Sequence, residues 1–474
     1  MRNRITILEK SLKCLTPLLL GGLLGCEAGG AASTSTAVRG ATSSESVVVL
    51  GAKLIDGTGG APIEDSVLVL RGDRIVAVGA ATATAIPTGA RVVRYSGKTI
   101  FPGLLSNHSH VGIVDGLVAG SAQYNRANIL RQVQQYEAYG VTTVTALGFN
   151  GAIFDGLRAE LHSGKTSGAD LFGVDRGIGV PGGAPSEAVV PVGADQILRP
   201  ATAEQAREAV RAMVSRRTDL VKLWIDDFGG TLPKMPPEVS QAAIDEAHRH
   251  GLRVAAHIHD LGDAKAAVRA GVDILAHGVR DQVVDGELTN LLKEHATWYV
   301  PTLQLDESAF VYADRPAWTT EPFVQRALHP DVRAQFEDPA WRERILAAPA
   351  TQAARAALAM NLRNLKILHD AGVAIGFGTD SGATPLRIPG VAEHRELVLM
   401  VEAGLTPLQA IGIATRDAAA VLRLGDRGTL APGKLADFVV VDRDPLQAIA
   451  NTQSIAAVWH RGQCAGCNAT YLAR

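Results

Sequence analysis

The stretch FPGLLSNHSHVG, residues 101–112, places two histidines two positions apart, just after a run that reads as a strand. Successive side chains of a strand point to opposite faces, so His108 and His110 are expected on one face, about 7 Å apart along the chain. Two imidazoles on one face suit metal ligation. Each could equally be a structural histidine that backbone groups satisfy.

Downstream of this stretch, apolar strand-like runs alternate with helical patterns as far as about residue 420. The strand-like runs are VTTVTAL, DLVKLWI, RVAAHIH, VDILAHG, WYVPTL and VAIGFGTD. About eight such units favour a parallel sheet closed into a (β/α)8 TIM barrel, an α/β fold, over residues 101–420. Within it, the segment 306–355 has no strand pattern and is expected to be an insertion with short helices over the barrel mouth.

Both flanks of the predicted barrel have β character. Residues 47–100 read as short strands separated by GTGG and PTG turns, and residues 421–474 contain LADFVVVDRDP and SIAAVWHRGQ. The simplest architecture pairs the two flanks in one small β-sandwich-like domain beside the barrel.

Residues 1–26 have the composition of a bacterial lipoprotein signal peptide. Basic residues precede the apolar run LTPLLLGGLLGC, which is too short for a membrane span and ends in small residues and a cysteine. With LLGC as lipobox, Cys26 would carry the lipid anchor of an exported periplasmic or outer-membrane lipoprotein; the alternative is cleavage nearby without a lipid. Residues 27–46 are small and polar and are expected to form a flexible tether.

Charge, cofactor motifs and cysteine content limit the functions that the sequence supports. The chain has 46 basic and 48 acidic side chains and no basic block, so no nucleic-acid partner is indicated. Neither a GxGxxG after an opening strand nor a P-loop occurs, so no redox cofactor motif is present. Cys464 and Cys467, in GQCAGC, lack a second CxxC or a histidine cluster, and a local disulfide is the expected outcome in an oxidising compartment.

Further polar residues fall near the carboxyl ends of the predicted barrel strands. His257 lies near the end of RVAAHIH, His277 lies near the end of VDILAHG, and Asp380 ends VAIGFGTD. In a barrel these ends converge on the catalytic face, so residues distant in sequence become neighbours. Singly, each could be a hydrogen-bonded histidine or a turn aspartate. His259, two residues after His257, shares its face and could replace it as the residue from that strand.

Lys222, in DLVKLW, is the polar residue least expected in a buried strand. An ammonium in an apolar strand costs several kcal/mol unless it is paired or chemically changed. The lysine could reach solvent along its own stem, or pair with Asp226 or Asp227.

The order HxH, Lys, His, His, Asp on a barrel flanked by β segments resembles the amidohydrolase superfamily, and within it the imidazolonepropionase-like and prolidase-like branch. The motifs AKLIDGTGG, FPGLLSNHSH, AHGVRD, GFGTDSG and GTLAPGKLADFVVVDRDP carry the resemblance. It implies two divalent metal ions, usually zinc, and a ligand role for the strand-end residues. His108, His110 and Asp380 would hold one ion, His257 and His277 the other, and Lys222, carboxylated by carbon dioxide, would bridge them.

Such a centre gives Lys222 a physical reason to be buried, because two dications offset the desolvation of a carbamate anion. A hydroxide shared by the metals would attack the substrate, and Asp380 would take its proton and pass it to the leaving nitrogen. The chain departs from the family pattern at two places. Ser106 stands where PGLIDxHxH has aspartate, and VPGGAPSE lacks the histidine of the Gly-Gly-His loop that many prolidase-like relatives carry.

Substrate contacts are expected on the mouth loops. An arginine there could clamp a carboxylate, and a tyrosine could donate a hydrogen bond. For each such residue the alternative is a solvated loop or a salt bridge. The residues concerned are Arg280, Asp281, Glu307, Tyr312, Arg387, His394 and Arg395, of which His394 opens the helical pattern AEHRELVLM.

Together these features predict an exported metal-dependent hydrolase that cleaves a C–N bond in a small amide, cyclic amide or dipeptide-like molecule. Two other functions stay open: a lactonase or phosphotriesterase that uses the same metals, and a non-catalytic surface binding protein. A small molecule is the expected partner, the membrane is involved only through the anchor at Cys26, and a homo-oligomer is compatible with the sequence.

Overall fold

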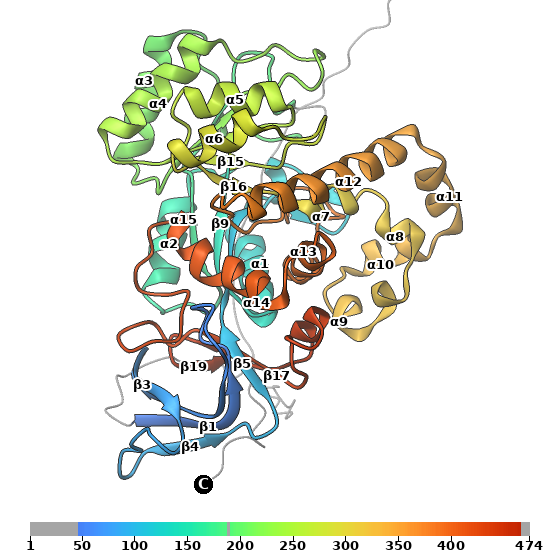
Figure 1. The fold of residues 1–474 in the computed structure, drawn as a ribbon. Helices are drawn as coiled ribbons and strands as arrows, with labels where there is room; N and C mark the ends of the chain where they lie inside the picture. Colours follow the sequence, from blue (N-terminus) through green and yellow to red (C-terminus); the bar gives the residue numbers. More distant parts are fainter. Residues whose placement is uncertain (1–45, 187–189, 466–474) are drawn as a thin grey trace, which may run out of the picture. The chain divides into compact units, whose positions relative to one another are not determined.

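The structure, a computed structural model, describes residues 46–186 and 190–465 (Figure 1). The predicted signal peptide with Cys26, the predicted tether up to residue 45, and Cys467 lie outside the described residues. Cys464 lies in β19 (Gln463–Ala465) and is disulfide-bonded. No helix within the described ranges is long and apolar enough to cross a membrane.

Strands from both flanks of the chain form one mixed sheet, which confirms the predicted pairing of the flanks. Its order is β19-β18-β17-β5-β1-β2-β3, and β4 pairs with β1 off this path. The flanks meet where β17 runs antiparallel to β5, with Phe438 opposite Pro102. Both faces of β1 are apolar, because Val49 packs in one buried cluster and Val48 in another. The bounds are β1 (Ser46–Leu54), β2 (Ile63–Arg71), β3 (Arg74–Ala80), β4 (Arg91–Arg94), β5 (Thr99–Pro102), β17 (Phe438–Val441) and β18 (Ile455–His460).

The barrel is a ring of parallel strands, as the alternating pattern predicts. One sheet has the order β10-β9-β6. Three residues after β10 comes β11, which belongs to a second sheet in which β11 pairs with β13, followed by β14, β15 and β16. Residues 373–381 close the ring: Ile375 pairs with Tyr299 of β16, and Ser381 pairs with Ser109 of β6. The bounds are β6 (Leu104–Ser109), β9 (Val141–Ala146), β10 (Asp170–Gly173), β11 (Gly177–Ile178), β13 (Val221–Trp224), β14 (Val254–His257), β15 (Ile274–Ala276) and β16 (Trp298–Val300).

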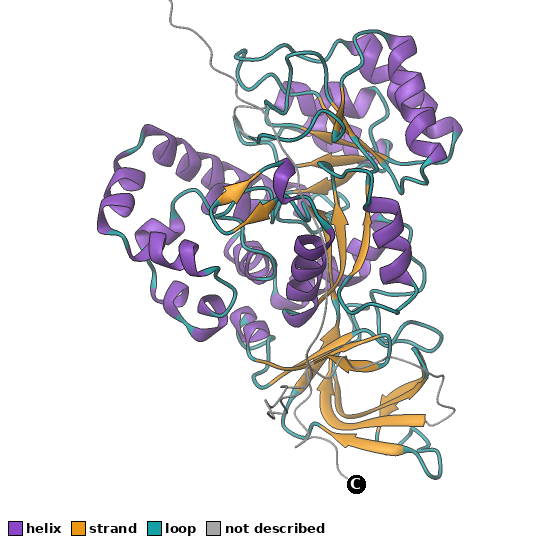
Figure 2. Ribbon diagram, turned by 180° about the vertical axis from the view of Figure 1, so that it is seen from behind, coloured by secondary structure: helices purple, strands orange, loops and turns teal. Residues whose placement is uncertain are grey.

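Helices connect and flank the barrel strands (Figure 2). Helix α4 shows why: Val239, Ala242, Ala243 and Ala247 are buried, and their three- and four-residue spacing makes one apolar stripe that packs inward. The bounds are α1 (Arg126–Ala138), α2 (Phe154–His162), α3 (Ala203–Ser215), α4 (Pro237–Arg249), α5 (Leu261–Arg269), α6 (Gly286–Glu294), α12 (Pro349–Asp370), α13 (Val391–Glu402), α14 (Pro407–Gly412) and α15 (Ala418–Val421).

The predicted insertion is helical. Its apolar side chains, such as Phe310 and Trp341, form a core shared with Tyr139 and Val391 outside the insertion. The insertion reaches the barrel mouth, because Ser308 and Gln335 line a cavity that the mouth loop after residue 381 also lines. Its helices are α7 (Leu303–Glu307), α8 (Val311–Asp314), α9 (Pro322–Gln325), α10 (Pro330–Glu337) and α11 (Pro339–Ala347).

Candidate metal centre

A buried group of two histidines and an aspartate lies where the barrel ring closes. His108 and His110 direct Nε2 at the same carboxylate oxygen, Oδ1 of Asp380, at 3.1 and 2.9 Å. Candidate ligand atoms of the three residues lie within 4.8 Å of one another, a spacing that could hold one metal ion. The three exposed fractions are 1%, 3% and 6%, so the group is shielded from solvent.

Backbone pairing brings these residues together. The Asp380 N–H donates to the carbonyl of His108 at 2.8 Å, and the His110 N–H donates to the carbonyl of Ser381 at 2.7 Å. Asp380 has φ of 60°, in the left-handed region that non-glycine residues rarely occupy. The turn at the end of the last barrel segment therefore aims the carboxylate at β6 at a cost in backbone strain.

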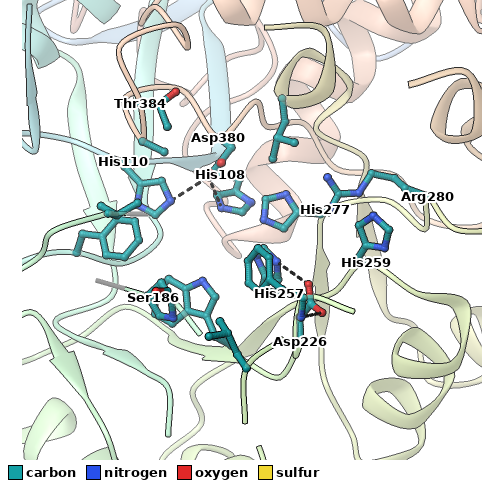
Figure 3. A pocket seen from close by; sticks show the side chains of 18 of the residues that line it. His108, His110, Ser186, Asp226, His257, His259, His277, Arg280, Asp380 and Thr384 are labelled. Carbon is teal, nitrogen blue, oxygen red and sulfur yellow. Dashed lines mark hydrogen bonds and ion pairs between the residues drawn. The ribbon is translucent and has the colours of Figure 1, made fainter. Parts of the chain in front are cut away.

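The histidines of β14 and β15 extend this group. The ring of His277 lies 4.4 Å from the ring of His108 and 4.4 Å from the ring of His257, centre to centre (Figure 3). Nδ1 of His277 is hydrogen-bonded to Oγ1 of Thr302 at 2.9 Å, which leaves Nε2 for a ligand. His257 contacts Asp226, with 3.4 Å between Nε2 and Oδ2.

The structure separates the two histidines that the sequence left as alternatives on this strand. His257 lies against His277, at the buried end of the pocket. His259 is 41% exposed and its Nδ1 is bonded to Asp260 at 2.6 Å, so it belongs to the pocket's outer wall.

Lys222 of β13 is fully buried beside this group. Its Nζ has no hydrogen-bond partner within the described part of the chain. Pairing with Asp226 or Asp227 does not occur, because Asp226 contacts His257 and Asp227 lies near Lys234. Burial lowers the pKa of Lys222 to about 7, although the charge of Asp380 opposes that change.

The shifts in pKa favour neutral histidine rings and an ionised Asp380. Burial lowers the pKa of His108 to about 3 and that of His257 to about 4, and the pKa of His277 also falls well below its usual value. Burial alone would raise the pKa of Asp380, but Arg387 and the two neighbouring histidines hold it well below its usual range. Neutral imidazole and ionised carboxylate are the forms that bind divalent metals.

The group lies at the bottom of a pocket of about 560 Å³. Its apolar lining is partly aromatic: Phe149, Val190, Trp224 and Leu232 belong to one apolar cluster, and Phe228 also lines the pocket. The lining also has polar side chains, among them Arg280, Thr384 and Arg387. The pocket can therefore accept a ligand with one apolar and one polar end.

Two of the predicted substrate contacts, Arg280 and Arg387, line this pocket. Arg280 is paired with Asp306 at 3.1 Å, between NH1 and Oδ1. Arg387 pairs with the outer oxygen of Asp380, and its buried Nε has no partner among residues 46–186 and 190–465.

The structure does not bring Tyr312 and His394 to the pocket, which corrects the expectation for both. Tyr312 is buried in the insertion core, where its ring stacks on Phe336 at 4.3 Å between centres. His394 is fully buried, with its two nitrogens bonded to Tyr139 and Thr452. Sequence spacing placed both near the mouth, but packing turns their side chains into cores instead.

The other mouth residues have structural partners. Glu307 and Arg395 form a close ion pair with each other, with 2.7 Å between Oε1 and NH2. Asp281 accepts from the backbone N–H of Leu261 at 2.9 Å, at the start of α5.

Sequence reasoning missed Thr302 and the aromatic wall. Thr302 orients His277 from the next strand end, and Phe149 and Trp224 stack at 5.3 Å between ring centres. The available signal was position: each follows or ends a barrel strand, as the metal-site residues do.

Comparisons with known proteins show the family to which the chain belongs. The amidohydrolase family matches residues 99–464. Ochratoxinase of Aspergillus niger is 27% identical over 268 residues, 54% of this chain and 48% of that protein, so the match spans about half of that relative. Imidazolonepropionase of Streptomyces griseus is 25% identical over 447 residues, 91% of this chain and 99% of that protein.

Solved structures show the same fold. A Xaa-Pro dipeptidase with methionine bound in its active site matches with a TM-score of 0.71 and 23% identity, covering 89% of this chain and 100% of that one. Molinate hydrolase matches with a TM-score of 0.69 and 21% identity, covering 91% and 97% of the two chains.

Proposed function

Because this chain belongs to the amidohydrolase family, we propose that it hydrolyses a C–N bond in a small amide, cyclic amide or dipeptide-like molecule. The observation that carries the proposal is the buried group of His108, His110 and Asp380 at the bottom of a pocket large enough for such a molecule. The names of the relatives, which include a dipeptidase and an imidazolonepropionase, support the same bond type.

The residues present fit two divalent metal ions, and zinc suits their nitrogen and oxygen donors. His108, His110 and Asp380 would hold one ion, and His257 and His277 the other. The buried amine of Lys222 has no hydrogen-bond partner within the described residues and lies 5.6 Å from the centre of the Trp224 ring. It would suit a carbamate shared by the two ions, because carboxylation would remove a buried cation. Bound metals would polarise the scissile carbonyl and lower the pKa of water.

Asp380 has the position and charge of the proton carrier. It is ionised, and its two oxygens face the histidines on one side and Arg387 on the other. It would accept the proton of the attacking water and return it to the leaving nitrogen. This makes Asp380 the catalytic residue of the proposed reaction.

The pocket favours a substrate with an apolar group and a carboxylate. The apolar group would pack between Phe149, Trp224 and Phe228. Arg387, which lines the pocket, would bind the carboxylate. N-acyl amino acids and dipeptides with a large apolar residue have both features.

The test is amine release from a panel of N-acyl amino acids, dipeptides and cyclic amides, with the zinc-loaded full chain. We expect cleavage of substrates with an apolar acyl or amino-terminal side, and its loss in Asp380→Asn. If a folded, metal-loaded protein releases no amine from any substrate of the panel, amide hydrolysis is refuted. Lactones and phosphotriesters would then be assayed as substrates of the same metal centre.

We further propose export and a lipid anchor at Cys26, supported by the basic and apolar segments of residues 1–26. Incorporation of labelled palmitate in a bacterial host tests this. The label should be lost in Cys26→Ser, and an unlabelled wild-type chain would contradict the anchor.

A further inference from the structure

We propose that helix α13 positions both halves of the metal centre through two buried carboxylates, Glu393 and Glu396. Both side chains are 0% exposed, and neither is among the described residues that line the pocket. They are positioning residues and not ligands. The inference rests on the proposed metal-dependent function but concerns residues other than the proposed metal ligands.

Glu393 holds the backbone on both sides of Asp380. Its Oε1 accepts a hydrogen bond from Oγ1 of Thr379 and another from Oγ of Ser381, each at 2.7 Å. Its Oε2 accepts from the backbone N–H of Gly390 at 2.7 Å. Because Thr379 and Ser381 are the two neighbours of Asp380, one carboxylate fixes the strained turn that aims Asp380 at the histidines.

A chain of serine hydroxyls connects Glu393 to β6. Oγ of Ser381 also contacts Oγ of Ser109 at 3.3 Å, and Oγ of Ser109 contacts that of Ser106 at 2.8 Å. Ser106 lies 3.4 Å from Glu393. This buried chain of hydroxyls ties the strand that bears His108 to the same carboxylate that holds the Asp380 turn.

Glu396 acts on the other half of the centre. Its two oxygens accept the backbone N–H groups of Leu303 and Gln304, each at 2.8 Å. These residues directly follow Thr302, which has φ of 50° and whose hydroxyl is hydrogen-bonded to Nδ1 of His277. Glu396 therefore holds the turn that orients the His277 ring.

One helix can hold both turns because Glu393 and Glu396 are three positions apart and lie on the same face of α13. The helix is itself fixed by His394, which bonds to the carbonyl of Tyr139 at 2.8 Å and to Oγ1 of Thr452 at 2.9 Å. Burying two carboxylates is costly unless both are hydrogen-bonded, as they are here. Hydrogen-bonded partners around a metal ligand usually set its orientation and so its affinity for the ion.

The test measures zinc affinity by competition with a chelator, in the folded full chain, for Glu393→Gln and Glu396→Gln. An amide cannot accept with both of its terminal atoms, so each variant loses hydrogen bonds at little change in volume. We expect zinc affinity to fall 10- to 100-fold in each. Glu402→Gln, at the half-exposed end of the same helix, is the matched control and should bind zinc as the wild type does.

The zinc affinity of the variants distinguishes a positioning role of Glu393 and Glu396 from a purely structural role. Variants that are less stable to denaturant but bind zinc with wild-type affinity while folded would overturn the inference. If Glu393→Gln does not fold, Thr379→Ala removes one hydrogen-bond partner of Glu393. If Glu396→Gln does not fold, Glu396→Asp draws the carboxylate back from the backbone N–H groups of Leu303 and Gln304. Unchanged zinc affinity in the variants that fold would equally overturn the inference. A wild-type chain that binds no zinc would instead refute the proposed function.

Discussion

Replacing Lys222 with methionine should have opposite effects in the metal-free and metal-loaded protein. Lys222 is buried, and its Nζ makes no hydrogen bond to any described residue. Methionine is similar in volume and has no charge to desolvate, and the substitution breaks no hydrogen bond of the amine. In the metal-free protein the change therefore removes a penalty.

The size of that penalty follows from the pKa. Burial lowers the pKa of Lys222 from 10.5 to about 7 in the folded, metal-free chain. Each pKa unit corresponds to about 1.36 kcal/mol, so below pH 7 the buried amine costs about 5 kcal/mol. Because the folded state binds fewer protons than the unfolded state, this cost shrinks as pH rises from 7 and vanishes above 10.5.

Denaturant unfolding with chelator present, at pH 7 and pH 10, measures the effect. Lys222→Met should raise the free energy of unfolding of the metal-free protein by several kcal/mol at pH 7 and by much less at pH 10. With zinc at about 1,000 times its Kd, the wild type should gain about 4 kcal/mol and the variant clearly less. A metal-free variant no more stable than the wild type would refute the penalty, and full metal retention in Lys222→Met would refute the bridging role.

Three further predictions concern the pocket, the barrel and the buried histidine at the end of β18, His460. Phe228→Ala should raise KM for substrates with a large apolar group by a larger factor than it lowers kcat, because the ring lines the pocket and also stacks on that of His257, at 5.7 Å between centres; steady-state kinetics with a lower kcat and an unchanged KM would contradict this. Gly378→Ala should weaken zinc binding at least tenfold, because a Cβ there would lie 2.8 Å from the backbone nitrogen of His108; wild-type affinity in a chelator competition would contradict this close contact. Burial lowers the pKa of His460, but nearby carboxylates, Asp437 first, outweigh burial and raise it to about 10, above its unfolded value of 6.5. Its stabilisation should be complete below pH 6.5 and lost as pH rises towards 10, so His460→Gln should flatten the decline in unfolding free energy over that range, and an unchanged slope would exclude the histidine as its source.

Most of the fold could be predicted from local patterns. The alternation of strand and helix patterns predicted the parallel barrel, and the β character of both flanks predicted their shared sheet. Both are consequences of periodicity and turn residues, which short stretches of sequence record. The closing segment, residues 373–381, pairs through isolated bridges and not a regular strand, and its apolar run still showed where the ring closes.

The sequence alone determined that two histidine positions, a lysine, two more histidines and an aspartate would meet. Parallel barrel strands present all their carboxyl ends on one face, so position along each strand is enough to bring residues such as His108 and Asp380 together. Only the tertiary structure decided which polar residues face the pocket and which support it. Tyr312 and His394 turned into packed cores, and Glu393 and Glu396 came to hold the turns beside Asp380 and His277. Such contacts join segments far apart in the chain, and they depend on loop paths and side-chain packing that no local pattern encodes.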